Sequence, residues 1–252
     1  MEKLRVAEGI LQYRFPPHEG KHYGFNILAL LDEEKKAAWL VDTAYEEQAG
    51  AVRRELEKAG YTITGAVISH FHPDHVLGLA ALPKMIVIGS PRAEETLSPF
   101  GEPEEWEARR PTRSVGESDV VRFGPFELRF RFAPGHSPCS MYALIDDRFV
   151  HVADNVMTSN DGRDILPWAE FERIQDHIDS LDLLREFGDR TALLSHGVTI
   201  DDAAILNEAI DNRIKYFRAV LDGDGAISID EATADCKCDF LHKEWLIRKG
   251  AA

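Results

Sequence analysis

The stretch "ISHFHPDHVLGL" (residues 68–79) gathers three histidines and an aspartate within a few positions: His70, His72, Asp74 and His75. The whole chain contains only 10 histidines among 252 residues, so composition alone does not explain this cluster. The apolar run "GAVI" (65–68) comes directly before it and predicts a buried strand that leads into a polar loop. Histidine and aspartate are side chains that bind transition metals, so the sequence predicts a metal site at the end of a strand.

Three further polar residues follow predicted strands in the same way. His136 stands in "PGHSP", Asp154 in "HVADN" and His196 in "LLSHG". Loops above the ends of a rigid sheet commonly bring together site residues that are distant in sequence. We therefore expect these side chains to join the histidine cluster.

Composition limits the classes of function. The formal net charge is −15, which argues against non-specific binding to nucleic acid or to anionic membrane surfaces. No run of 18 apolar residues predicts a membrane span, and residues 1–15 lack the apolar core of a signal peptide. The three cysteines, at 139, 236 and 238, form no disulfide framework. We expect a cytoplasmic protein with a small-molecule substrate, and a homodimer is compatible with the sequence.

Hydrophobic patterning predicts alternating strands and helices. Strands are expected at 25–31, 37–42, 65–70, 85–90 and 191–197, with hairpins over 119–134 and 141–154. Helices are expected at 46–60, which ends at Gly60, at 171–188, and from 201 onward. The charged, proline-bearing stretch 98–111 is expected to be a loop.

With these motifs, the chain resembles the metallo-β-lactamase superfamily of hydrolases. The resemblance covers roughly residues 10–200 and rests on five motifs in order: "LVDTA" with Asp42, H-x-H-x-D-H at 70–75, "PGHS", "VAD" and "SHG". It implies an α/β fold, an αββα sandwich of two mixed sheets flanked by helices. Residues 1–200 would form the catalytic domain, and residues 201–252 a short C-terminal helical extension packed on it.

The resemblance also implies a dinuclear metal site, most simply two Zn²⁺ ions, with Mn²⁺ or Fe²⁺ as alternatives. His70, His72 and His136 would hold the first ion; Asp74, His75 and His196 would hold the second. Asp154 would bridge the two, and Asp42 would support the ligands from behind. The implied function is a hydrolase that uses a metal-bridging hydroxide on an ester, lactone, thioester or phosphoester. Asp74 would also be catalytic, orienting the hydroxide or passing its proton.

Two other activities within the resemblance remain open. A mononuclear iron sulfur dioxygenase acting on a persulfide would use only His70, His136 and Asp154. A true β-lactamase generally carries cysteine or serine in place of Asp154. His72, in place of the glutamate of the diiron electron-transfer members, favours a hydrolase. Ala153 departs from the glycine that is usual before the bridging aspartate.

Apolar residues in loops near the ligands are candidates for substrate binding. Trp106, Ile165 and Trp168 are expected at the rim of the site, together with Phe100. Tyr23 is a candidate hydrogen-bond donor to a developing oxyanion, but we do not assign it that role.

The remaining histidines are not expected to bind metal. His151 is expected to pack within its strand or face solvent, and His177 lies on a predicted outer helix. His18 and His22 lie in a loop, and His242 is expected at the surface.

Two C-terminal motifs resemble metal sites only in part. "DGDGAISIDE" (222–231) matches positions of a calcium loop, but the first ligand position holds Val220. We expect a turn between two helices there. "CKCDFLH" (236–242) lacks the spacing of a zinc site.

Overall fold

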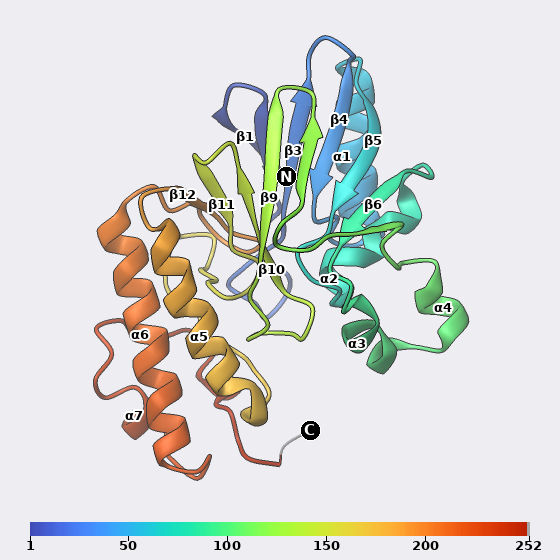
Figure 1. Ribbon diagram of the computed structural model, residues 1–252. Helices are drawn as coiled ribbons and strands as arrows, with labels where there is room; N and C mark the ends of the chain where they lie inside the picture. Colours follow the sequence, from blue (N-terminus) through green and yellow to red (C-terminus); the bar gives the residue numbers. More distant parts are fainter. Residues whose placement is uncertain (251–252) are drawn as a thin grey trace.

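The computed structural model describes residues 1–250 and consists of two β-sheets packed face to face, with helices on both outer faces (Figure 1). The expected αββα sandwich is confirmed. The last two residues of the expected C-terminal extension, 251–252, lie outside the described residues.

The first sheet has seven strands in sequence order: β1 (Glu2–Ala7), β2 (Ile10–Arg14), β3 (Asn26–Asp32), β4 (Ala37–Val41), β5 (Thr62–Val67), β6 (Ile86–Gly89) and β7 (Arg113–Ser114). Pairing is antiparallel from β1 to β4 and parallel from β4 to β7, so the sheet is mixed. The predicted hairpin of β3 and β4 is confirmed, with Leu30 opposite Trp39.

The second sheet has five strands in the order β12 (Thr191–Leu193), β11 (Phe149–His151), β10 (Met141–Ile145), β9 (Phe126–Phe132) and β8 (Val120–Phe123). Both predicted hairpins are confirmed. Asp146 and Asp147 have φ of 53° and 51°, the left-handed conformation that a tight two-residue hairpin turn requires.

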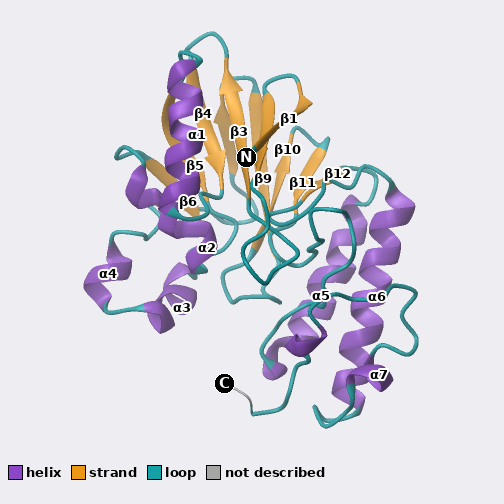
Figure 2. Ribbon diagram, turned by 180° about the vertical axis from the view of Figure 1, so that it is seen from behind, coloured by secondary structure: helices purple, strands orange, loops and turns teal. Residues whose placement is uncertain are grey.

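The long helices cover the two outer faces. On one side, α1 (Glu46–Lys58) packs Val52 and Leu56 against the seven-stranded sheet and ends before Gly60, whose φ is +88°. On the other side, α5 (Ile174–Leu184) and α6 (Ala203–Asp222) cover the five-stranded sheet (Figure 2). Short helices lie in the connections: α2 (Pro73–Val76), α3 (Ala93–Leu97), α4 (Pro103–Glu107) and α7 (Ile229–Ala232).

Strand β3 shows why the apolar runs are continuous. Ile27 and Ala29 face the helix side, whereas Leu28 and Leu30 face the second sheet. Because a central strand of this sandwich is covered on both faces, it has no polar face to alternate with.

The structure adds elements that the sequence did not predict. The first 14 residues form the edge hairpin of β1 and β2. The stretch 98–111, expected to be a loop, contains α4, whose first turn is fixed by a capping box between Glu102 and Glu105 and by Pro103.

The C-terminal part shares its core with the rest of the chain. From α6, Leu206, Ile210 and Phe217 pack in the same apolar cluster as Tyr142 of β10 and Val150 of β11. Residues 201–250 therefore cover the second sheet and have no core of their own.

The partial calcium motif is used for helix capping. Val220 is buried, and Ser228 caps α7 while exchanging hydrogen bonds with Glu231. In "CKCDFLH", the thiol of Cys236 donates to the carbonyl of Asn212. Over residues 1–250, no helix is both long and apolar enough to cross a membrane.

Candidate metal centre

The ligand-bearing loops all follow strands, at one end of the sandwich. His70 comes just after β5, and Pro73 starts the single turn of α2 that carries Asp74 and His75. His136 lies in the loop between β9 and β10; Asp154 and His196 come just after β11 and β12. Strand ends thus bring together residues that are up to 126 positions apart in the sequence (His70 to His196).

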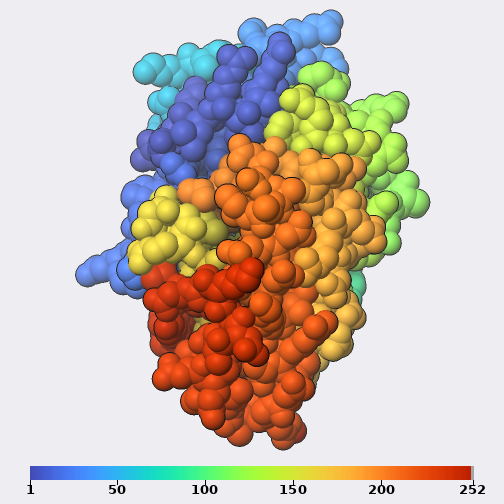
Figure 3. Space-filling view, turned by 90° about the vertical axis from the view of Figure 1, so that its left-hand side faces the viewer, coloured from blue at the N-terminus to red at the C-terminus, as the bar shows by residue number. Residues whose placement is uncertain are grey.

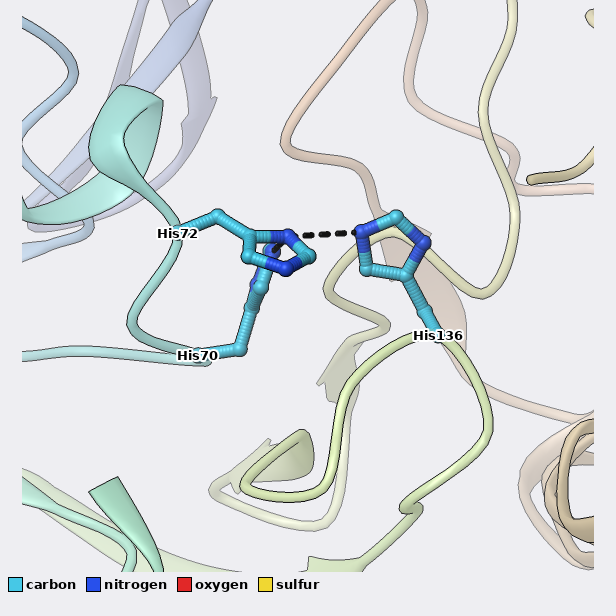
Figure 4. Close-up of side chains that lie close together, drawn as sticks. All are labelled: His70, His72 and His136. Atoms are coloured by element: carbon cyan, nitrogen blue, oxygen red, sulfur yellow. Dashed lines mark hydrogen bonds between the residues drawn. The ribbon is translucent and has the colours of Figure 1, made fainter. Parts of the chain in front are cut away.

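Three imidazoles form the first group of donors. The Nδ1 atom of His72 lies 3.1 Å from Nε2 of His70 and 3.0 Å from Nε2 of His136 (Figure 4). Nitrogen ligands about 2.1 Å from one tetrahedral ion would be about 3.4 Å apart, close to these separations. Burial lowers the pKa of all three imidazoles. They are therefore neutral, as metal ligands must be.

The second group consists of Asp74, His75, Asp154 and His196. The Nε2 atoms of His75 and His196 lie 3.4 and 3.3 Å from Oδ2 of Asp154. Both Nε2 atoms and Oδ1 of Asp154 are buried, and within the described chain none has a hydrogen-bond partner. Leaving buried polar atoms unpaired is costly, so this cluster fits a bound cation.

Asp154 lies between the two groups. Its Oδ2 atom is also 3.6 Å from Nε2 of His136 and 4.0 Å from Nε2 of His70. Burial alone would raise the pKa of this carboxyl, but the imidazoles of His196 and His75 hold the pKa well below its usual value. The carboxylate is therefore ionised and within reach of both metal positions.

A layer of hydrogen bonds behind the ligands fixes their orientation. The Nδ1 atom of His75 lies 2.8 Å from Oδ2 of Asp42, and Nδ1 of His196 lies 2.9 Å from the carbonyl of Gly24. Asp42 also accepts hydrogen bonds from the backbone N–H and the hydroxyl of Ser69, each at 2.8 Å. These bonds turn the Nε2 atoms of both histidines toward the site.

The backbone before Asp154 is in an unusual conformation. Ala153, where the superfamily usually has glycine, is fully buried and has a φ of +50°. A left-handed residue with a side chain costs about 1 kcal/mol, so the chain tolerates strain at this turn.

A cavity of about 370 Å³ opens above the metal centre. It is lined by Tyr23, His72, Pro73, Asp74, Phe100, His136, Asp154, Met157, Trp168 and Trp245. Trp168, which the sequence predicted at the rim, is 43% exposed. Its carbonyl lies 3.1 Å from Nδ1 of His136, so this residue touches both the cavity and a ligand.

Two predicted rim residues lie in the core and do not line the cavity. Trp106 is only 8% exposed. It is the one large apolar residue of α4, and its ring lies beneath the guanidinium of Arg110. Ile165 is fully buried because its segment pairs with the backbone at Leu241. Both predictions of a rim position were wrong.

The prediction that His242 lies at the surface was also wrong. Its ring stacks on Trp245 at 4.5 Å, its Nδ1 atom lies 2.8 Å from Glu244, and it is 6% exposed. His151 is buried in β11, and His177 is buried behind His136 with ring centroids 6.4 Å apart.

Sequence reasoning missed three cavity residues: Met157, Trp245, and Pro73 within the H-x-H-x-D-H motif. Met157 follows Asp154 closely and could have been inferred from that proximity. Trp245 lies far beyond the last metal motif, and no local pattern marks it.

Comparison with known proteins places the chain in a family. The model of the metallo-beta-lactamase superfamily matches residues 25–196, which is more than half of the chain. The chain belongs to the metallo-beta-lactamase superfamily.

Relatives within the superfamily differ in their named activities. The mitochondrial persulfide dioxygenase of Mus musculus is 28% identical over 133 residues, 52% of this chain and 48% of that protein. A hydroxyacylglutathione hydrolase of Bradyrhizobium sp. (strain ORS 278) is 31% identical over 120 residues, 46% of this chain and 43% of that protein. The matches thus span less than half the length of these relatives.

Solved structures share the fold. A sec-alkylsulfatase from Pseudomonas sp. superposes with a TM-score of 0.67 at 15% identity, covering 98% of this chain and 47% of that one. A metallo-beta-lactamase family protein from Thermus thermophilus gives a TM-score of 0.64 at 18% identity, covering 89% of this chain and 84% of that one.

Proposed function

We propose that this protein is a dinuclear metal hydrolase that cleaves an ester, lactone, thioester or phosphoester. The observation that carries the proposal is the pair of donor groups, of three and four side chains, with Asp154 between them. Likeness to hydroxyacylglutathione hydrolases supports a hydrolytic reaction.

The reaction adds water across the scissile bond and releases a carboxylate or phosphate anion, an alcohol or thiol, and a proton. Two divalent cations, for which zinc is the expected choice, would polarise the scissile carbonyl or phosphoryl group and activate water at neutral pH. Asp74 lines the cavity, and its side chain is 26% exposed. We assign its carboxylate to accept the proton of the attacking water and to return it to the leaving group.

The charge of Asp154 bears on which bond is cleaved. When a β-lactam is cleaved, the leaving group is an amide nitrogen, which requires strong stabilisation by a metal cation. The ionised carboxylate of Asp154 would weaken the stabilisation that a second metal could give to the leaving nitrogen, whereas alkoxide, thiolate and phosphate groups leave more easily. We therefore expect esters, lactones or phosphoesters to be cleaved much faster than β-lactams.

A persulfide dioxygenase is the second candidate, favoured by the mouse relative. It would need one iron on two histidines and one carboxylate. The complete second group, with buried and unpaired Nε2 atoms on His75 and His196, supports the hydrolase instead.

The experiment combines metal analysis with a substrate panel on metal-supplemented protein. We expect close to two metals per chain and the highest kcat/KM for an ester, lactone, thioester or phosphodiester. One iron per chain with oxygen uptake on a persulfide would overturn the hydrolase in favour of the dioxygenase. A cephalosporin turned over faster than every ester and phosphoester would overturn the assigned bond type.

We also propose a small-molecule substrate, because the cavity is small and the chain is strongly acidic. The three cysteines are unpaired, which supports our proposal of a cytoplasmic, reducing location.

A further inference from the structure

We propose that the cavity selects uncharged esters and thioesters with an apolar acyl or aryl group, and that Trp245 sets this preference. The inference rests on the proposed hydrolytic function and names its substrate class. It concerns the walls of the cavity, whereas the metal centre forms the floor.

Aromatic side chains from distant parts of the chain make up these walls. Tyr23 comes from the loop before β3, Trp168 from the segment after β11, and Trp245 from the C-terminal segment, residues 240–250. The rings of Tyr23 and Trp245 meet edge to face, with centroids 5.8 Å apart. Together with Phe100 and Met157 they present an apolar surface, which gains free energy when it covers an apolar group of the substrate.

The C-terminal segment is firmly attached, so Trp245 is a fixed wall. Leu241 exchanges backbone hydrogen bonds with Asp164 and Leu166, each at 2.9 Å. Further along, the N–H of Ile247 donates to the hydroxyl of Tyr216 at 3.1 Å. Figure 3 shows this segment in red, lying across α6 and meeting the yellow stretch that follows β11. Trp245 is therefore positioned before the substrate arrives, which favours selectivity.

The charges around the cavity disfavour an anionic substrate. The carboxylates that line it, Asp74 and Asp154, belong to the metal centre, and among the described residues no lysine or arginine lines it. Lys21 contacts the ring of Trp245 at 4.7 Å but is not a lining residue. Arg173, in the neighbouring cavity, is already paired with Glu170 at 3.1 Å.

A remote carboxylate on the substrate would therefore lose water without gaining a cationic partner. The positive charge of bound metals would lie at the floor, where the donor side chains are and where the reacting carbonyl would bind. A neutral apolar group meets no such penalty against the aromatic walls.

The test compares two thioesters that share one acyl group. One is the uncharged N-acetylcysteamine thioester, and the other is the glutathione thioester, which carries carboxylates in excess of its ammonium group. With octanoyl as the acyl group, we expect kcat/KM on metal-loaded protein to favour the uncharged thioester by about tenfold or more.

Two matched variants test the role of charge. Phe100, 47% exposed, lines the cavity, whereas Ile205, 59% exposed on α6, does not. Phe100→Arg should shift the preference toward the glutathione thioester by about threefold, the effect of one partly exposed ion pair. Ile205→Arg makes a similar change away from the cavity and should leave the preference unchanged.

Trp245 is tested by the length of the acyl chain. Trp245→Ala should raise KM for the octanoyl thioester about tenfold with little effect on the acetyl thioester, and Trp245→Phe should restore most of the loss. Equal losses on both acyl groups, with metal content unchanged, would overturn the role of Trp245.

Preference for the glutathione thioester would overturn the substrate class while leaving the hydrolase standing. No turnover of any ester, lactone, thioester or phosphoester would instead overturn the hydrolase itself.

Discussion

At the scale of single residues, we expect the candidate metal centre to depend most on Asp154. Its Oδ2 atom lies within 4.0 Å of Nε2 atoms from both donor groups. Among residues 1–250, no other carboxylate lies this close to histidines of both donor groups. The first prediction therefore concerns its negative charge.

Asp154→Ala should lower the metal content from about two per chain toward one and reduce kcat at least about a hundredfold. Without the shared anion, the two cations would repel each other and the second position would lose a ligand. Metal analysis and steady-state kinetics on the same preparation provide the measurement. Full metal occupancy with a near-normal rate would contradict the bridging role.

Asp42 acts through His75. Asp42→Asn keeps an oxygen that can accept from the N–H of Ser69, and asparagine tolerates the φ of +56° at this position. It replaces the anion beside Nδ1 of His75, however, so affinity for the second metal should fall about 10-fold to 100-fold. Metal titration monitored by calorimetry measures this change.

Asp32→Asn is the matched control. Asp32 is also buried, at 4% exposed, but it lies at the end of β3 and accepts from the backbone of Lys35. Equal effects of the two substitutions on metal affinity would show that Asp42 has only a general structural role.

At the scale of elements, Arg213 attaches α6 to the segment that follows Asp154. Its guanidinium is fully buried, lies 2.7 Å from the carboxylate of Asp164, and donates to the carbonyl of Met157 at 2.6 Å. The helix thereby holds the cavity wall at Met157.

Arg213→Met should lower the free energy of unfolding by about 3 kcal/mol, because it leaves the Asp164 carboxylate and a buried carbonyl without their partner. Arg185→Met removes a more exposed arginine that pairs with Asp211 on the same helix and should cost under about 1 kcal/mol. Denaturant unfolding of both variants gives the comparison. Similar losses of unfolding free energy in the two variants would show that the buried pair of Arg213 and Asp164 contributes no more to stability than the exposed pair.

At the scale of the whole molecule, metal binding and folding should be coupled. The donors come from loops after β5, β9, β11 and β12, so they meet only when both sheets are folded. A metal at 100 times its dissociation constant stabilises the native state by about 2.7 kcal/mol per site.

For two sites in a chain of this size, metal loading should therefore raise Tm by about 10 to 20 °C over the chelated protein, and strong chelation should abolish turnover. Differential scanning calorimetry with and without chelator measures the shift. An unchanged Tm together with full activity in chelator would show that the protein works without metal.

The sequence by itself marked the candidate metal-binding residues, and its resemblance to the superfamily implied the fold class. The H-x-H-x-D-H motif, His136, Asp154 and His196 keep their order and residue types, and each follows a strand. Metal chemistry restricts which side chains can serve, and strand ends fix where they point, so local patterns carry this information. The three hairpins and α1 were predicted from local patterns in the same way.

The walls of the cavity were decided only by the tertiary structure. Trp106, Ile165 and Trp168 look alike in sequence, as apolar residues in loops near ligands, yet only Trp168 lines the cavity. Trp106 is buried by α4, and Ile165 is buried by pairing with Leu241, a contact across 76 residues of sequence (165 to 241). Trp245 reaches the cavity through that same pairing. Burial of such side chains depends on which distant segment covers them. The local sequence around an apolar residue does not show whether it lies in the core or at the rim of a cavity.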